Sequence, residues 1–214
     1  AEIGHILKDH PAAYHVDAVQ AIGKLPIHPE ELGIDFLSAS AHKFHGPKGV
    51  GFLYASSGDF DSYLHGGDQE QKKRAGTENL AAIVGMVSAL KEDLNDQVEH
   101  YQKLSALKSV FLKEISDLDY YLNESQDQLP YVFNIGFPGQ KNDLLLLRLD
   151  LEGISISTGS ACTAGIVQTS HVLEAFYGSD SHRLKESVRI SLSPLNTEEE
   201  LKQLAQTLKN IIGD

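Results

Sequence analysis

Ser38-Ala39-Ser40-Ala41-His42-Lys43 is the stretch that decides the fold, together with the earlier His15-Val16-Asp17-Ala18-Val19-Gln20. Each motif overlaps the end of a short apolar run, at 13–16 and at 36–39. We expect each run to form a buried strand of a parallel sheet, with a crossover between the two strands. Functional residues of open α/β sheets lie at the carboxyl ends of the strands. The sequence therefore predicts an α/β enzyme with both motifs at one sheet edge.

An acid and a lysine at such an edge are what pyridoxal 5'-phosphate (PLP) chemistry requires. Lys43 would hold the cofactor aldehyde as a Schiff base, and Asp17 would keep the ring nitrogen protonated. Gln20 would hydrogen-bond the phenolic oxygen, while Ser40 and His42 would donate to the phosphate. The small and apolar neighbours of Lys43 predict an enclosed position. Taken alone, Asp17 would be a turn residue and Lys43 a solvated lysine.

Composition narrows the classes of function. The chain has 214 residues, 18 basic and 30 acidic side chains and a formal charge of −12, so a nucleic-acid backbone would be repelled. A single cysteine excludes an internal disulfide framework, and no apolar stretch reaches the roughly 18 residues of a membrane span. No signal-like segment is visible. We expect a cytoplasmic protein without nucleic-acid or membrane partners.

A metal site is not expected. His42 and His45 share a loop, but no acid or cysteine near them in the sequence completes a ligand set. Outside a cofactor role, His42 would be a hydrogen-bonded core histidine.

The chain divides into two predicted domains. Residues 1–97 read as the C-terminal portion of an α/β PLP-binding domain, and residues 98–214 as a small α+β domain. Apolar spacing predicts a helix that starts near Thr77 and continues toward Phe111. Thr197 and Glu200 form a predicted capping box for the last helix. The expected strands are 13–17, 35–41, 49–54, 131–137, 154–157 and 187–192, and the other expected helices are 142–151, 170–177 and 197–212.

Two further residues carry predicted chemistry. Cys162 is the only thiol and lies among small residues at 158–165. We expect such a loop to be free to move, so that the Cys162 thiolate could attack the sulfur of a substrate. A lone cysteine is otherwise most often a buried, inert residue. Arg189 alternates with Val188 and Ile190 along a strand, and its fork suits bidentate capture of a carboxylate. A surface salt bridge is the alternative for Arg189.

Six segments together resemble the cysteine desulfurases, PLP enzymes of the aminotransferase (fold type I) superfamily. They occur in the order of that family and cover nearly the whole chain: 15–20, 40–43, 46–51, 74–79, 157–165 and 187–191. The loop Ser160-Ala161-Cys162-Thr163 is similar to the class with a long mobile cysteine loop. The resemblance also implies that an N-terminal part of the PLP domain is missing and that the chain is a C-terminal fragment, which we expect to be inactive alone.

The resemblance implies a reaction and partners. L-cysteine would become L-alanine, with the sulfur left as a persulfide on Cys162. Thr77 would reach the cofactor phosphate of the other subunit, which makes a homodimer part of the site. The sulfur acceptor would be an iron–sulfur scaffold or a tRNA-thiolating enzyme, between which the sequence does not choose. The alternatives are another fold type I enzyme, such as an aminotransferase or selenocysteine lyase, or a non-catalytic fragment for dimerisation or partner binding.

Overall fold

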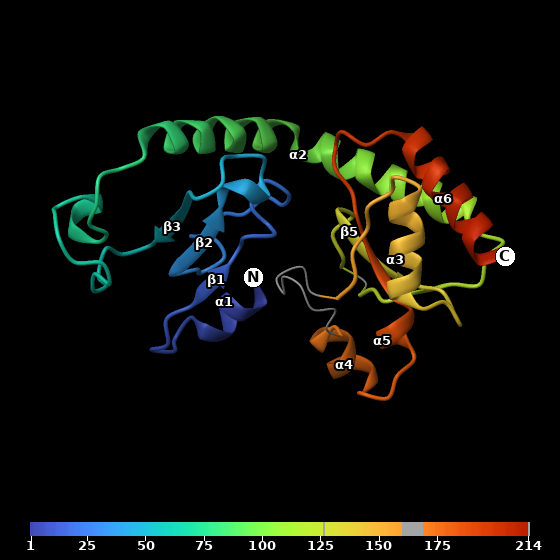
Figure 1. Cartoon of the computed structure of the whole chain (residues 1–214). Helices are drawn as coiled ribbons and strands as arrows, with labels where there is room; N and C mark the ends of the chain where they lie inside the picture. The colour runs from blue at the N-terminus through green and yellow to red at the C-terminus, as the bar shows by residue number, and fades with distance from the viewer. Residues whose placement is uncertain (126, 160–168, 214) are drawn as a thin grey trace. The chain divides into compact units, whose positions relative to one another are not determined.

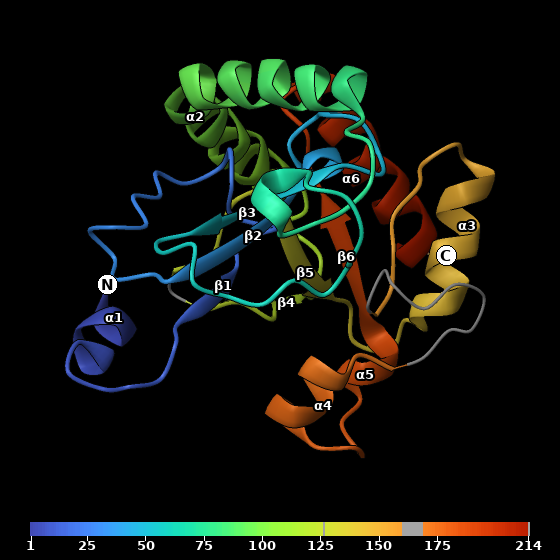
Figure 2. The same ribbon diagram turned by 90° about the vertical axis from the view of Figure 1, so that its left-hand side faces the viewer.

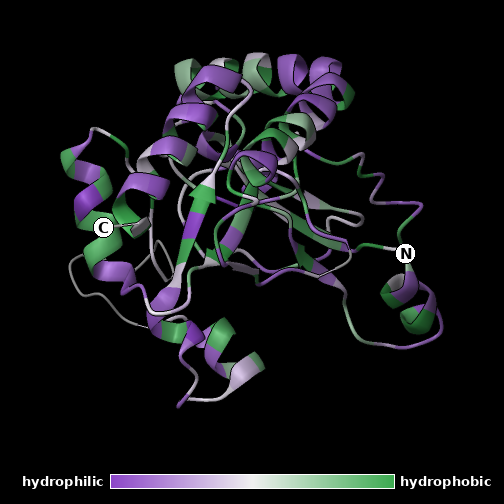
Figure 3. Cartoon of the chain, turned by 90° about the vertical axis from the view of Figure 1, so that its right-hand side faces the viewer, coloured by the Kyte–Doolittle hydropathy of each residue, from purple (hydrophilic) through white to green (hydrophobic). Residues whose placement is uncertain are grey.

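The computed structural model describes residues 1–125, 127–159 and 169–213 (Figure 1). The chain divides into two compact units, Ala1–Glu99 and His100–Asp214, and each has its own three-stranded sheet. The sequence places this boundary at residue 97. Helix α2 (Leu80–Glu114) runs without interruption through the boundary, as its apolar spacing predicts. Hydrophobic and hydrophilic stretches are interspersed along this helix (Figure 3).

The sheet of the first unit has the strand order β1-β2-β3, and the three strands lie side by side in Figure 2. β1 runs parallel to β2 and β2 antiparallel to β3, with Asp17 opposite Ser38 and Ser40 opposite Gly51. The α/β fold class and the parallel pairing of the two motif strands are thereby confirmed. The elements of this unit before α2 are α1 (Glu2–Leu7), β1 (His15–Asp17), β2 (Phe36–Ser40), the 3-10 helix η1 (Ala41–Lys43), β3 (Gly51–Ala55) and the 3-10 helix η2 (Glu70–Lys72).

The expectation of two buried strands is only partly right. Leu37 and Ala39 are buried in β2, whereas β1 has exposed residues on both sides of a half-buried Val16. The reason is that β1 is the edge strand of a three-stranded sheet, so only β2 flanks it. The helix expected near Thr77 starts later, at Leu80.

The second unit is an antiparallel sheet covered by helices. Its core includes side chains of β5, β6, α3, α6 and the second half of α2, among them Phe111, Phe133, Leu149, Val188 and Leu208, all nearly inaccessible to solvent. The elements are β4 (Tyr121–Leu122), β5 (Val132–Gly136), α3 (Asn142–Leu151), α4 (His171–Tyr177), α5 (Arg183–Glu186), β6 (Ser187–Ser191) and α6 (Glu198–Gly213).

The helices and two of the three strands expected in this unit are present. The strand expected at 154–157 is wrong, because only Ser157 makes an isolated bridge, to Arg189. The short β4 and α5 were not predicted. The capping box of α6 is confirmed: Thr197 Oγ1 accepts from the Glu200 amide at 3.2 Å, and Glu200 Oε2 accepts from the Thr197 amide at 3.0 Å.

None of the helices in the described part of the chain combines the length and apolar composition needed to cross a membrane.

Candidate active site

Asp17 ends the edge strand β1, and its side chain is exposed. Its Oδ1 accepts a hydrogen bond of 3.0 Å from the amide of Val19, which tightens the turn after the strand. The same turn is hydrogen-bonded to the neighbouring strand β2, because the Ala18 amide donates to the Ser38 carbonyl at 2.9 Å. The carboxylate therefore stands at the carboxyl end of a strand, where the sequence places it, with its second oxygen directed to no partner among the described residues.

Lys43 lies one short turn beyond the end of β2. Ala41, the first residue of η1, and Phe44, the residue that follows η1, are buried at 0% and 1% exposure, since positions three apart face the same way around a 3-10 turn. His42 and Lys43 consequently lie on the other face, and both are exposed. The enclosed position predicted for Lys43 is thus wrong for this chain: the apolar neighbours turn into the core, and the amine turns away from it. Ser40, the last residue of β2, is half-buried.

Gln20 lies in the turn after β1 and is exposed. Its Oε1 accepts from Lys24 Nζ at 3.2 Å, which leaves the amide nitrogen as the donor of this side chain. Burial lowers the pKa of Lys24, the positive charge of Lys43 lowers it further, and the charge of Asp93 opposes both. Lys24 is therefore an electrostatic neighbour of Lys43 that sequence reasoning missed.

Thr77 is exposed and lies three positions before the first residue of α2. The cap of the helix is Asn79, whose Oδ1 accepts from the Ala82 amide at 3.2 Å, while its carbonyl accepts from Ile83 at 2.9 Å. The prediction that Thr77 begins the helix is wrong, since asparagine is an equally favoured cap and stands closer to the first apolar turn. Thr77 remains a residue of the segment that leads into this helix.

An acid from a distant part of the sequence lies beside His45. The His45 ring nitrogen Nδ1 is 2.9 Å from Oδ1 and 3.2 Å from Oδ2 of Asp93, a residue of α2 that is only 6% exposed. The two residues are 48 positions apart, so no local pattern shows the pair. Among the described residues, no group of three His, Cys, Asp or Glu side chains is arranged to hold a metal ion.

In the second unit, Arg189 occupies the centre of β6 opposite Asn134 of β5. Val188 and Ile190 are buried at 1% and 3% exposure, while Arg189 is half-buried on the other face, as the alternation predicts. Arg189 Nε donates to Ser157 Oγ at 3.0 Å, and the backbones of these two residues pair in both directions. No acid of the described chain pairs with the guanidinium, so its two terminal nitrogens are available to a carboxylate.

Cys162 and Ser160 lie outside the described residues. The described part of the chain reaches Gly159 on one side of them and Thr169 on the other.

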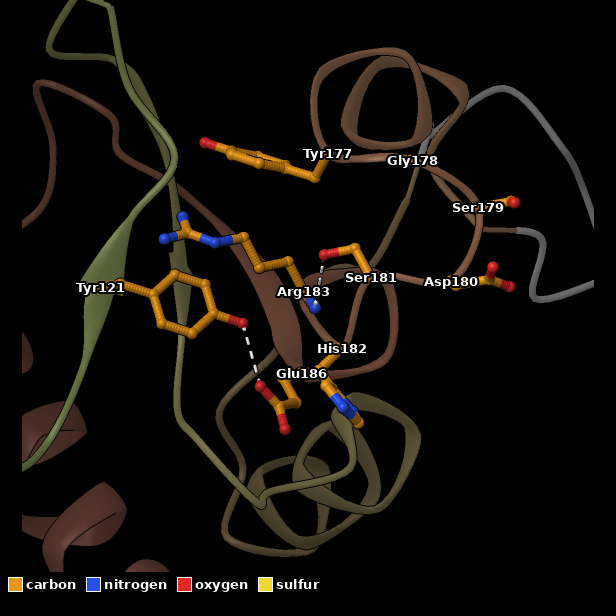
Figure 4. A pocket seen from close by; sticks show the side chains of 9 residues that line it. All are labelled: Tyr121, Tyr177, Gly178, Ser179, Asp180, Ser181, His182, Arg183 and Glu186. Atoms are coloured by element: carbon orange, nitrogen blue, oxygen red, sulfur yellow. Dashed lines mark hydrogen bonds between the residues drawn. The ribbon is translucent and has the colours of Figure 1, made fainter.

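The second unit also contains a hollow of about 700 Å³, which is lined by residues that the sequence did not single out. Figure 4 shows Arg183 between the rings of Tyr121 and Tyr177, and its guanidinium carbon lies 4.1 and 4.5 Å from their centroids. Its Nη1 donates to Asn123 Oδ1 at 2.6 Å, and the Tyr121 hydroxyl donates to Glu186 at 3.2 Å. Arg183, Tyr121 and Glu186 are thereby held by neighbouring side chains, and none of the predicted site residues lines this hollow.

Comparison with known proteins defines the class. The chain belongs to the aminotransferase class-V family, whose family model matches residues 1–204. It is similar to the putative cysteine desulfurase IscS 1 of Bacillus subtilis (strain 168), with 45% identity over 215 residues, which cover 99% of this chain and 57% of that protein.

Solved structures show the same likeness. A NifS-like protein matches with a TM-score of 0.88 and 33% identity, over 99% of this chain and 56% of that one. A structure described as SspA in complex with cysteine matches with a TM-score of 0.70 and 33% identity, over 92% of this chain and 55% of that one. The chain thus spans little more than half the length of the relatives that it matches.

Proposed function

We propose that the protein carrying this chain is a PLP-dependent cysteine desulfurase, which converts L-cysteine to L-alanine and leaves the sulfur as a persulfide on Cys162. The observation that carries the proposal is the placement of Asp17 and of Ser40 to Lys43 at the carboxyl ends of two adjacent parallel strands. Membership of the aminotransferase class-V family and similarity to proteins named cysteine desulfurase support it.

The side chains in the first unit fit PLP. An exposed carboxylate, an exposed primary amine and the donors of Ser40 and His42 are gathered at one edge of the sheet, and His42 and Lys43 are turned out of the core. These match the pyridine nitrogen, the aldehyde and the phosphate of the cofactor in chemical type. Gln20, whose oxygen is held by Lys24, would offer its amide N–H to the phenolic oxygen. Bound PLP would supply an electron sink for the substrate α-carbon.

The remaining steps belong to the side chains of the chain itself. Asp17 would hold a proton on the pyridine nitrogen, and the Lys43 amine would take the proton from the substrate α-carbon. Arg189 would bind the substrate carboxylate with the two terminal nitrogens that Ser157 leaves unused.

Cys162 would carry out the sulfur transfer. Its thiolate forms a sulfur–sulfur bond to the substrate as the substrate carbon–sulfur bond breaks. The electron pair of the broken bond stays with the carbon, which takes up a proton to give alanine. The persulfide would then pass its outer sulfur to an acceptor protein, an iron–sulfur scaffold or a tRNA-thiolating enzyme.

The proposal extends to the assembly. We propose a cytoplasmic homodimer in which Thr77 reaches the cofactor phosphate of the other subunit, and domains at 1–97 and 98–214. We also propose that the 214-residue chain alone is inactive, because Lys43 is exposed in it and because catalysis requires a rigidly enclosed cofactor.

The test compares Lys43→Ala and Cys162→Ala in the full-length gene product supplied with PLP and L-cysteine. Both variants should release no alanine above the background, and Cys162→Ala should still bind PLP. A Cys162→Ala variant that releases sulfur at the normal rate would assign the chain to a lyase of the same fold, such as a selenocysteine lyase, whereas a wild type that consumes L-cysteine without releasing alanine or sulfur would assign it to an aminotransferase.

A further inference from the structure

We propose that Asp93 is a positioning residue for Lys43, acting through its contact with His45. The inference rests on the proposed function, in which Lys43 carries PLP, and it concerns a pair of residues that the proposed reaction does not use.

The loop after Lys43 has an unusual conformation that needs an anchor. His45 has a φ of +65°, in the left-handed region that residues other than glycine seldom occupy. The carbonyl of Ala41 accepts from the amides of both Phe44 and Gly46, at 3.0 and 2.9 Å, so the loop closes tightly on the start of η1. Lys43 is inside this closed loop, and any movement of His45 moves the backbone of Lys43 with it.

Asp93 supplies that anchor from a different element. Its carboxylate faces the His45 ring nitrogen with both oxygens, and its side chain is 9% exposed while that of His45 is 58% exposed. The buried member of the pair therefore belongs to the long helix α2, and the exposed member belongs to the loop. A buried carboxylate requires a hydrogen-bond partner, and we therefore expect Asp93 to keep its contact with His45.

The surroundings of Asp93 leave it little freedom. A methyl group added at Gly23, where φ is +77°, would lie 3.1 Å from Asp93 Oδ2 and 3.2 Å from the Cβ atoms of Asp93 and Phe44. Asp93 and the buried Phe44, the residue that follows Lys43, thus both pack against the turn at Gly23. Lys24, next to Gly23, shares the electrostatic environment of Asp93 and Lys43.

Together these contacts hold Lys43 from both sides. Before it, Ser40 pairs with Gly51 of β3, and the Ala41 amide donates to the carbonyl of Val50, the residue before β3, at 3.0 Å. After it, Phe44 is buried and His45 is bound to Asp93. Loss of the last contact would leave the fold in place and allow the Lys43 amine to move, and misplacement of a reacting group by about 1 Å can cost up to about a hundredfold in rate.

The experiment measures attachment of PLP to Lys43. The full-length gene product is incubated with excess PLP, borohydride reduces the carbon–nitrogen double bond that forms, and peptide mapping gives the rate of labelling at each lysine. Asp93→Ala should slow labelling of Lys43 by about tenfold and leave the labelling of exposed lysines unchanged. Asp93→Asn, which keeps an oxygen acceptor for His45, should retain most of the rate. Asp96→Ala, an exposed aspartate on the same helix, is the matched control.

A second readout needs no cofactor. Amide hydrogen exchange of Gly46, whose N–H donates to Ala41, should accelerate by about tenfold in Asp93→Ala, while the amides of the β2–β3 ladder keep their protection. His45→Asn tests the same contact from the side of the loop: asparagine tolerates a positive φ, and its Nδ2 is as many bonds from Cα as the ring Nδ1, so it can still donate to Asp93. It should keep both the labelling rate and the Gly46 exchange of the wild type.

The outcomes separate the two proposals. Absence of labelling at Lys43 in the wild-type full-length gene product would overturn the proposed function, and the exchange of Gly46 would still decide whether Asp93 anchors the loop. Normal labelling of Lys43 together with unchanged Gly46 exchange in Asp93→Ala would overturn the positioning role.

Discussion

Replacement of Arg189 by alanine removes the group that we propose binds the substrate carboxylate. In the structure, Arg189 Nε is bound to Ser157 Oγ at 3.0 Å, so the two terminal nitrogens remain for a bidentate pair with the substrate. A hydrogen bond to a charged group contributes about 1.5–3 kcal/mol. At about 1.4 kcal/mol for each factor of ten, kcat/KM for L-cysteine should fall by roughly 10- to 150-fold in the full-length gene product.

Three further variants sharpen this prediction. Arg189→Lys keeps the charge and loses the planar fork, so it should fall between the wild type and Arg189→Ala. Ser157→Ala removes one hydrogen bond that orients the guanidinium, which is worth about 1 kcal/mol and about fivefold in kcat/KM. Ser191→Ala, an exposed position at the end of the same strand, should have no effect. Unchanged kcat/KM in Arg189→Ala would return this arginine to a structural role.

Three other predictions follow from the structure. Lys43→Ala in the full-length gene product should abolish the visible absorbance of bound PLP and all turnover, and retention of both would refute the cofactor assignment. Thr197→Ala should lower the free energy of unfolding by about 1 kcal/mol, measured by denaturant titration. The hydrogen bonds that Glu200 accepts from the Asn196 side chain and the Thr197 amide lower its pKa from 4.5. Their contribution is complete above pH 4.5 and disappears as the pH falls through the lowered folded-state pKa. A difference in unfolding free energy between the wild type and Glu200→Gln that does not change with pH through this range would contradict this. The isolated 1–214 chain should bind PLP weakly, release no alanine and self-associate through its open sheet edges, which sedimentation and an alanine assay would show.

The sequence predicts the local features of the site well. The carboxyl ends of β1 and β2 are recognisable because a short apolar run stops at a polar motif in each case, and the two strands pair in parallel as expected. The face of β6 that carries Arg189 follows from simple alternation. The capping box of α6 follows from the spacing of Thr197 and Glu200, since both partners lie within one turn.

The features that the sequence did not predict depend on distant or finely balanced interactions. The pair of His45 and Asp93 joins a loop to a helix 48 positions away, so local spacing carries no signal for it. The exposure of Lys43 depends on whether the backbone continues as a strand or as a 3-10 turn after Ser40, and the two choices send the side chain in different directions. At the start of α2, Thr77 and Asn79 are competing caps of similar strength.

The central claim is tested most directly by following the substrate sulfur. The full-length gene product is incubated with PLP and sulfur-labelled L-cysteine, quenched under non-reducing conditions and digested, and the labelled peptide is identified while alanine is measured in the same sample. The account predicts the label as a persulfide on the peptide that contains Cys162, alanine in equal amount during the first turnover, and neither in Lys43→Ala. Alanine and free sulfide formed at the normal rate by Cys162→Ala, or label on no cysteine of the wild-type protein, would contradict it.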